Sequence, residues 1–355
     1  MRDGGTALLH RVKPTRAPET AAGRHRQASW RCRGRLWLVV LVVAAALEGH
    51  PSHGEGARPI RIGALTDAWG ATPHIMGLRD GLAELGYQPD QDFFLGIRFT
   101  RGKRDLLPTA ARELVQAGAD LLFVDSIVTA QAAQQAASDI PIVFTSVEDP
   151  VGSGLIQSYA RPGGNMTGVA SLDIELGPKR LQMFQELVPG LRRVLFLYDH
   201  QDRYAAEAAA LYQQAARQLG IDWVEATVET PAQAQTLLAE VHQRHIDGIV
   251  TPRCCASNIP GLILEATLAQ RIPTMFHTAA YWIEAGALAS YGPDLYTSGY
   301  QAARIVDKII QGANPATIPV EVNSAIKFTI NLKTAKALEL HLDPEVLAQA
   351  DEVAR

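Results

Sequence analysis

The sequence predicts an α/β protein made of two doubly wound lobes, each with a parallel β-sheet, and three observations support this class. The chain has 355 residues, enough for about two domains of ordinary size. From residue 60 onward, short runs of apolar or β-branched residues alternate with longer amphipathic patterns, as in βαβ units. A glycine-containing segment, 160–180, divides this alternation into two series. We therefore expect one lobe from each series.

The first series contains four predicted strands, at 60–65, 94–99, 121–124 and 141–144. Between the second and third of them, the stretch 105–117 repeats apolar residues at helical spacing, and Gly118 follows it. Glycine commonly stands just past a helix end, so this stretch is predicted to be a helix.

The second series also contains four predicted strands, at 194–198, 223–228, 248–251 and 273–276. A long helical pattern over 203–219 stops at Gly220. Thr230 and Pro231 form a typical N-cap and first-turn pair, which predicts the start of another helix.

Beyond the second series, the chain has more elements than one lobe needs. They are a strand at 287–292, a helix over 295–311, a strand at 326–332 and a helical tail. We therefore expect the chain to cross back to the first lobe and then return. The predicted lobes are 58–170 with 290–320 and 171–289 with 321–355, after a leader over 1–57.

The leader predicts export. Arg31, Arg33 and Arg35 precede an apolar run over 36–47. A positive region followed by an apolar run of this length is typical of a signal peptide, whereas a membrane span, the alternative, needs about 20 apolar residues. We expect cleavage within 47–58, and the absence of a cysteine directly after the run argues against a lipid anchor.

Charge and cysteine content narrow the function classes. Residues 1–57 hold nine Arg and Lys and four Asp and Glu, which leaves 24 basic against 33 acidic residues in the rest of the chain. An excess of acidic residues after residue 57 argues against a nucleic-acid-binding protein, which needs a basic surface. Cys32 lies in the leader, and the adjacent Cys254 and Cys255 are poorly placed for a disulfide with each other.

Sequence signatures of catalysis are weak. The motifs GxGxxG, GxxxxGK[ST] and HExxH do not occur. His242 and His245 would share one face of a helix, but a solvated helix face is the preferred interpretation because the sequence places no third metal ligand. We expect no catalysis, no cofactor and no metal.

Candidate ligand-binding residues follow the predicted strands, because ligands of parallel α/β sheets bind at the carboxyl ends of the strands. In the first lobe they are Thr66, Asp67, Trp69, Asp125, Ser126, Thr145, Ser146 and Asp149. Further along the chain they are Tyr198, Asp199, Thr251, His277, Tyr291 and Asp294.

Some of these residues have an alternative structural role. Asp149 is also placed to cap a helix that starts at Val151, and Asp294 to cap the helix over 295–311. Trp69 and Tyr291 would supply either an apolar wall of the site or part of the core.

Six stretches carry a family resemblance, in order along the chain. They are GLRDGLAELGY (77–87), PIVFTSVEDPVGSGL (141–155), ARPGGNMTG (160–168), GPKRLQMFQELVPGLRRVLFLY (177–198), GALASYGPDLY (286–296) and INLKTAKALEL (330–340). Over about residues 60–341, the chain resembles a bacterial family of ABC-transporter substrate-binding proteins. The resemblance implies a type I periplasmic-binding-protein-like fold, in which two lobes joined by three crossovers close on a small ligand. It also implies uptake, with family members linked to amino acids, aromatic ones among them.

We therefore expect a periplasmic, monomeric solute-binding protein that passes a small ligand to an ABC permease and its ATPase. The predicted ligand is an amino acid or a related zwitterion. Thr145, Ser146 and strand-end amides would hold its carboxylate, and Asp294, or Asp199 or Asp125, its ammonium. The alternatives are a periplasmic sensor that signals to a membrane partner, and a two-lobed α/β enzyme, for which the sequence offers no phosphate loop or acid–base pair.

Overall fold

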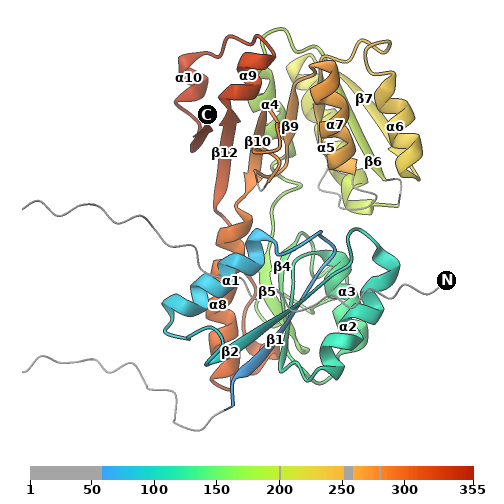
Figure 1. Ribbon diagram of the computed structural model, residues 1–355. Helices are drawn as coiled ribbons and strands as arrows, with labels where there is room; N and C mark the ends of the chain where they lie inside the picture. Colours follow the sequence, from blue (N-terminus) through green and yellow to red (C-terminus); the bar gives the residue numbers. More distant parts are fainter. Residues whose placement is uncertain (1–57, 200, 252–258, 280) are drawn as a thin grey trace, which may run out of the picture. The chain divides into compact units, whose positions relative to one another are not determined.

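The computed structural model describes residues 58–199, 201–251, 259–279 and 281–355. These residues form two α/β lobes, each built around its own sheet (Figure 1). The predicted fold class is thereby confirmed. The predicted leader and the pair Cys254 and Cys255 lie outside the described residues. In the part of the chain that the structure describes, no helix is both long enough and apolar enough to cross a membrane.

The first lobe contains a six-stranded sheet in which all neighbouring strands are parallel. In spatial order, its strands are β11 (Glu321–Val322), β5 (Met166–Ala170), β4 (Ile142–Val147), β3 (Leu121–Val124), β1 (Ile60–Thr66) and β2 (Phe93–Phe99). Its helices are α1 (Pro73–Glu84), α2 (Leu107–Gln116), α3 (Ile127–Ala136) and α8 (Leu295–Ile310), with short 3₁₀ turns η1 (Arg104–Leu106) and η3 (Pro315–Thr317).

The second lobe contains a seven-stranded sheet that is parallel except for the pair β10–β12. In spatial order, its strands are β13 (Glu352–Ala354), β12 (Ile326–Asn331), β10 (Ala289–Pro293), β9 (Thr274–Phe276), β8 (Gly248–Val250), β6 (Arg193–Asp199) and β7 (Asp222–Val228). Its helices are α4 (Gly177–Leu187), α5 (Arg203–Leu219), α6 (Pro231–Ala239), α7 (Ile259–Gln270), α9 (Leu332–Ala337) and α10 (Pro344–Leu347).

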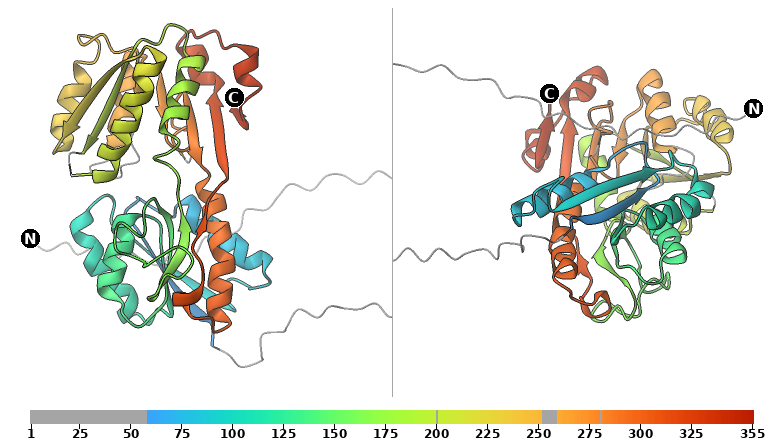
Figure 2. Two further views of the ribbon diagram at one scale, coloured as in Figure 1. Left: turned by 180° about the vertical axis from the view of Figure 1, so that it is seen from behind. Right: turned by 60° about the horizontal axis from the view of Figure 1, so that its bottom comes forward.

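Each sheet is covered by helices on both faces (Figure 2), and the alternation of side chains along the strands divides the core accordingly. In the first lobe, Phe123 and Val143 pack with α1 and α8, whereas Leu122 and Phe144 pack with α2 and α3. In the second lobe, the same alternation separates a core under α4 and α5 from one under α6 and α7. This is the doubly wound arrangement that the two series predict.

Several helix ends form as predicted. Gly220 follows α5 with a left-handed φ of 68°, which glycine adopts without steric cost. Thr230 caps α6 by accepting a hydrogen bond from the backbone N–H of Gln233, and Pro231 begins the helix. The helix predicted over 105–117 is divided into the 3₁₀ turn η1 and α2.

The structure corrects two predictions about the connecting segments. The segment 160–180, expected as a connection, contains the fully buried strand β5. Its Gly168 lies so close to the Phe144 carbonyl that a Cβ would overlap it, so the glycine that weakens the strand pattern is required by the packing. The expected helical tail also adds the edge strand β13.

The crossing points between the lobes differ from the predicted boundaries. Strand β10 belongs to the second sheet, where it pairs with β9 and β12, so the return to the first lobe begins at Asp294 instead of 290. Strand β11 pairs with β5 of the first sheet, so the last crossing lies at 323–325 instead of 320.

The three crossovers are the segment 171–176 between β5 and α4, Asp294 between β10 and α8, and the segment 323–325 between β11 and β12. Asn323 joins them, because its backbone N–H donates to the Ala170 carbonyl and its Nδ2 donates to the Asp294 carbonyl, each at 2.9 Å. The Asp294 N–H donates in turn to the Ala325 carbonyl at 2.8 Å. Hydrogen bonds therefore hold the crossovers side by side.

Candidate functional site

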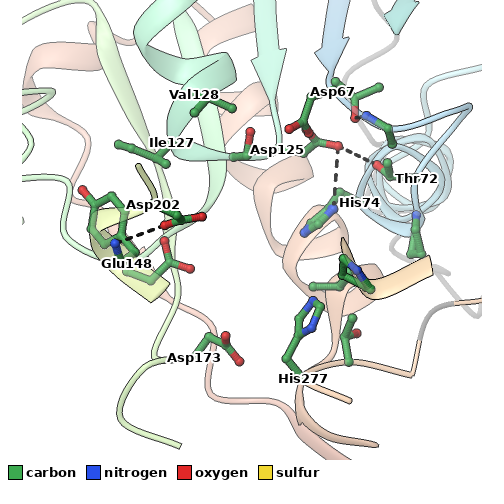
Figure 3. A pocket seen from close by; sticks show the side chains of 18 of the residues that line it. Asp67, Thr72, His74, Asp125, Ile127, Val128, Glu148, Asp173, Asp202 and His277 are labelled. Atoms are coloured by element: carbon green, nitrogen blue, oxygen red, sulfur yellow. Dashed lines mark hydrogen bonds and ion pairs between the residues drawn. The ribbon is translucent and has the colours of Figure 1, made fainter. Parts of the chain in front are cut away.

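A cavity of about 160 Å³ lies at the carboxyl ends of strands from both sheets. Asp67 follows β1, Asp125 follows β3 and Glu148 follows β4, while His277 follows β9 of the second sheet. The crossover residue Asp173 also lines it (Figure 3). A cavity with walls from two lobes and their connection is suited to a small molecule, because movement of the lobes can cover the molecule and exclude water.

The structure brings together six of the fourteen residues predicted from strand ends. The residues in the cavity lining are Thr66, Asp67, Trp69, Asp125, Ser126 and His277. The residues that do not line it are Thr145, Ser146, Asp149, Tyr198, Asp199, Thr251, Tyr291 and Asp294.

Thr145 and Ser146 lie behind the cavity wall. Thr145 is fully buried, and its Oγ1 donates to the Val124 carbonyl at 3.3 Å. Ser146 Oγ shares a hydrogen bond of 2.6 Å with Nε2 of His74, which itself lines the cavity. The two hydroxyls, which we expected to contact a ligand carboxylate, lie outside the cavity lining and make these bonds.

Asp149, Asp199 and Asp294 cap backbone turns instead of facing the cavity. Asp149 accepts from the Gly152 N–H at 2.7 Å in a turn, where no helix forms, and Asp199 accepts from the Gln201 N–H at 2.9 Å. Asp294 is the N-cap of α8, the alternative considered from the sequence. Aspartates commonly occupy such positions, so a strand-end location alone does not distinguish a cap from a ligand contact.

The remaining three residues are part of the second lobe's interior. Tyr198 and Tyr291 pack in or against the core under α4 and α5, and the Tyr198 hydroxyl donates to Glu225 at 2.6 Å. Burial and this carboxylate raise the pKa of Tyr198 above its ordinary value. Thr251 is fully buried at the end of β8.

Other lining residues were missed: most come from helix starts and loops, and Glu148 follows β4, whose predicted end at 144 was three residues short. They are Thr72, His74, Arg104, Glu148, Asp173, Asp202, Tyr204, Tyr281 and Trp282. One signal was present in the sequence: Thr72 and Pro73 repeat the N-cap and first-turn pattern of Thr230 and Pro231, and the helix that they begin carries His74.

Asp125 is the centre of a buried polar cluster on the first-lobe side of the cavity. Its Oδ2 accepts a hydrogen bond from Thr72 Oγ1 at 2.9 Å and lies 4.0 Å from His74 Nδ1 (Figure 3). Asp125 and the neighbouring lining residue Asp67 are both buried. A desolvated carboxylate strongly favours a cationic partner, so this side of the cavity is suited to a ligand ammonium.

An arginine of the first lobe faces an aspartate of the second across the cavity. Arg104 NH2 lies 3.8 Å from Asp202 Oδ2. Asp202 is also the N-cap of α5 and accepts from the N–H groups of Tyr204 and Ala205, each at 3.1 Å. Arg104 is the one arginine or lysine among the described lining residues. Because a guanidinium has five donors, it can bind a carboxylate ligand beside Asp202.

Asp173 forms an ion pair with a buried arginine, Arg180, behind the cavity. Its Oδ1 accepts from Arg180 NH2 at 2.5 Å, and Arg180 also donates to the Tyr212 hydroxyl and the Tyr291 carbonyl. Burial lowers the pKa of Arg180, but the Asp173 carboxylate outweighs this and raises it above its ordinary value. Asp173 therefore faces the cavity with a positive partner on its far side.

Aromatic side chains from both lobes form another part of the lining. Trp69 of the first lobe is 62% exposed, and Tyr281 of the second is 53% exposed. The ring centroids of Tyr281 and Trp282 are 4.2 Å apart, and those of Trp282 and Phe276 are 5.3 Å apart. Large, accessible aromatic rings of this kind can stack on an aromatic ligand, and the contact would remove apolar surface from water.

The described part of the lining is acidic. Among the described residues it contains five carboxylates, from Asp67, Asp125, Glu148, Asp173 and Asp202, against one arginine. Among the described residues, no group of three or more His, Cys, Asp or Glu side chains is arranged to hold a metal ion. His242 and His245, considered as a metal pair on one helical face, lie in a turn beyond the end of α6.

Two α/β lobes joined by three crossovers, with a cavity lined from both, form a fold of the type I periplasmic-binding-protein class. The family model for ABC transporter substrate binding proteins matches residues 65–354, and the chain belongs to this family.

Three similar proteins illustrate the family. A tyrosine-binding protein of Clostridioides difficile (strain R20291) is 26% identical over 266 residues, which cover 74% of this chain and 76% of that protein. A crystal structure of a conserved domain protein from Vibrio cholerae O1 biovar El Tor is 27% identical, with a TM-score of 0.74 over 83% of this chain and 100% of that one. The structure of an ABC domain from Streptococcus pneumonia in complex with L-Trp is 25% identical, with a TM-score of 0.73 over 83% and 99% of the two chains.

Proposed function

We propose that this protein is the solute-binding component of an ABC uptake transporter and that its ligand is an aromatic L-amino acid, bound in the cavity between Asp125 and Arg104. It would act in the periplasm and pass the ligand to a permease driven by an ATPase. The observation that carries the proposal is that one cavity combines buried carboxylates, an arginine and exposed aromatic faces.

The ligand's charged ends define the polar contacts. Asp125 and Asp67 would receive the ammonium group, because both carboxylates are buried in the lining. Arg104 would receive the carboxylate, because its guanidinium supplies the positive charge that this end of the zwitterion requires. This replaces Thr145 and Ser146, whose hydroxyls are engaged behind the wall.

The ligand's side chain would lie against the rings of Trp69 and Tyr281. Both rings line the cavity with more than half of their surface accessible, so an aromatic ligand would remove apolar surface of both lobes from water. The similar proteins named for binding tyrosine and solved with L-Trp support this class of ligand.

Calorimetric titration of the purified protein tests the proposal. L-tryptophan or L-tyrosine should bind, and L-leucine should bind more weakly. Tryptamine, which lacks the carboxylate, and indole-3-propionate, which lacks the ammonium, should each bind at least about tenfold more weakly than L-tryptophan. Tryptamine offers no carboxylate to Arg104, and indole-3-propionate offers no ammonium to the buried Asp125. Failure of all L-amino acids to bind would overturn the proposal.

A second measurement addresses transport. Uptake of labelled L-tryptophan into cells that express the partner permease and ATPase should depend on this protein. Binding without any contribution to uptake would favour the sensor that the sequence left as an alternative.

A further inference from the structure

We propose that His74 makes ligand binding dependent on pH, because its protonated imidazole would compete with the ligand ammonium for Asp125. The inference rests on the proposed function, since it takes Asp125 as the ammonium acceptor. His74 is a positioning residue in this scheme. Its charge acts electrostatically on Asp125 and sets how strongly that carboxylate attracts the ligand ammonium.

The geometry places His74 between a neutral partner and a charged one. It is the second residue of α1, it lines the cavity and it is only 4% exposed. Nε2 and Ser146 Oγ are 2.6 Å apart, and Nδ1 lies 4.0 Å from Asp125 Oδ2 (Figure 3). The two ring nitrogens therefore face two different groups.

The Ser146 contact depends on an irregularity in the sheet. The pairing of β4 with β5 shifts register between Thr145 and Val147, and Ser146 lies at the shift with a left-handed φ of 55°. A bulge of this kind redirects a side chain, and non-glycine residues rarely adopt such a φ. The hydroxyl is thereby directed to His74, so a strained backbone fixes the orientation of the ring.

The backbone of His74 is held from the other side by α8. A Cβ at Gly299 of α8 would overlap the His74 carbonyl, so this glycine allows α8 to approach the start of α1. The ring is thus fixed by a sheet bulge and by a close helix contact. Neither the Ser146 hydroxyl nor the Gly299 backbone carries a charge, so the charges that act on the ring come from the cavity side.

The charged groups on the elements around His74 line the same cavity. They are Asp67 after β1, Asp125 after β3, Glu148 after β4, Arg104 of η1, and His277 and Asp173 from the second-lobe side. Asp294 at the start of α8 is engaged with Lys327. The Asp125 carboxylate lies 4.0 Å from Nδ1 of the ring, close enough to be affected by a charge on His74.

Protonation changes what Nδ1 offers to Asp125. In the imidazolium both nitrogens donate, so with Nε2–H directed to Ser146 Oγ, Nδ1–H is directed to the carboxylate. A cation there satisfies the charge that would otherwise attract the ligand ammonium. By linkage, protonation weakens ligand binding, and ligand binding expels the proton from His74. An unperturbed histidine changes its charge between pH 5 and 8, so the test begins with that range.

The test is calorimetric titration with L-tryptophan and L-tyrosine at pH 5.5, 6.5, 7.5 and 8.0. Wild-type affinity should fall about tenfold from the highest pH to the lowest. His74→Gln should remove this dependence, because glutamine can still bond Ser146 but does not titrate. His242→Gln, at an exposed turn, should keep the wild-type dependence.

Each alternative outcome has a definite meaning. If His74→Gln keeps the wild-type pH dependence, or if His277→Gln alone removes it, the inference is wrong and the proposed function stands. If neither amino acid binds at any pH, the proposed function fails and the inference fails with it. If His74→Gln does not fold, NMR titration of the wild-type His74 ring decides: L-tryptophan should lower the pH of its protonation midpoint, and an unchanged midpoint would overturn the inference.

Discussion

The carboxylate of Asp294 forms an ion pair of 2.8 Å with the ammonium of Lys327. Asp294 ends the crossover from β10 and caps α8, accepting from the Tyr296 N–H at 3.1 Å and from Thr297 Oγ1 at 2.8 Å. Lys327 lies on β12, just after the last crossover. The pair therefore links two of the three connections between the lobes, and it gives Asp294 a structural role at the crossovers.

Replacing Asp294 should lower stability and leave affinity unchanged. Asp294→Ala removes the α8 cap and the partner of Lys327, which should cost about 1–2 kcal/mol of unfolding free energy. L-tryptophan affinity should stay within about twofold, because Asp294 does not line the cavity. Urea unfolding and calorimetry would check the two parts. A large loss of affinity at unchanged stability would restore Asp294 as a ligand contact.

The same pair predicts a stability change at acid pH. Burial raises the pKa of Asp294, but the bonds from Lys327 and Thr297 outweigh it and hold this pKa below its ordinary value. A carboxyl with a lowered pKa stabilises the folded state above its unfolded-state pKa of about 3.9, and this contribution is lost as pH falls through the folded-state pKa. The difference in unfolding free energy between wild type and Asp294→Asn should be constant from pH 7 to 5 and shrink below about pH 4. Urea unfolding across this range would measure it, and a difference that persists to pH 2 would contradict the explanation.

Neutralising Asp125 should weaken ligand binding strongly. Asp125→Asn keeps an oxygen that can accept from Thr72 but removes the charge proposed to hold the ligand ammonium. Truncation of one partner of a buried charge pair typically costs 2–5 kcal/mol, so L-tryptophan affinity should fall by about 30-fold or more. Asp139→Asn, at an exposed site in the same lobe, is the matched control and should bind as wild type. Equal affinities of the two variants would place the ammonium elsewhere.

The buried Arg180 network predicts strong coupling between Arg180 and Asp173. Arg180→Met should destabilise the protein by about 3–5 kcal/mol, because it leaves the Asp173 carboxylate buried without its cation. Adding Asp173→Asn should recover part of that loss, since the residual group is then neutral. Chemical denaturation of the two single variants and the double variant gives the coupling energy. Strict additivity would show that the two side chains do not stabilise each other.

Gly292 of β10 packs against the backbone of the cavity residue His277, so a larger residue at this position should disturb the cavity. A Cβ at this position would overlap the carbonyl of His277, a lining residue, so Gly292→Ala should displace it and reduce both stability and L-tryptophan affinity. Gly96→Ala is the control, because its Cβ would meet only the Ile62 carbonyl at 4.0 Å. Thermal unfolding and titration would compare them, and an affinity of Gly292→Ala equal to that of the control would contradict the link.

The sequence alone determined the class of the protein and most of its elements. Apolar periodicity, together with caps such as Thr230 and Gly220, is local information, and α5, α6 and the central strands lie where it predicts. The rule that ligands lie at the carboxyl ends of parallel strands pointed to Asp67, Asp125 and His277, which line the cavity.

Tertiary structure decided the rest, because it depends on contacts between distant segments. Strands β5 and β11 form against neighbours that supply their hydrogen bonds, so their own short or glycine-containing sequences carry little signal. A bulge directs Ser146 away from the cavity and to His74, while Asp294 is drawn to Lys327, a partner 33 positions later in the chain. Arg104, Asp202 and Tyr281 meet at one cavity only because two lobes and three crossovers bring their loops together, and spacing along a single chain does not encode that proximity.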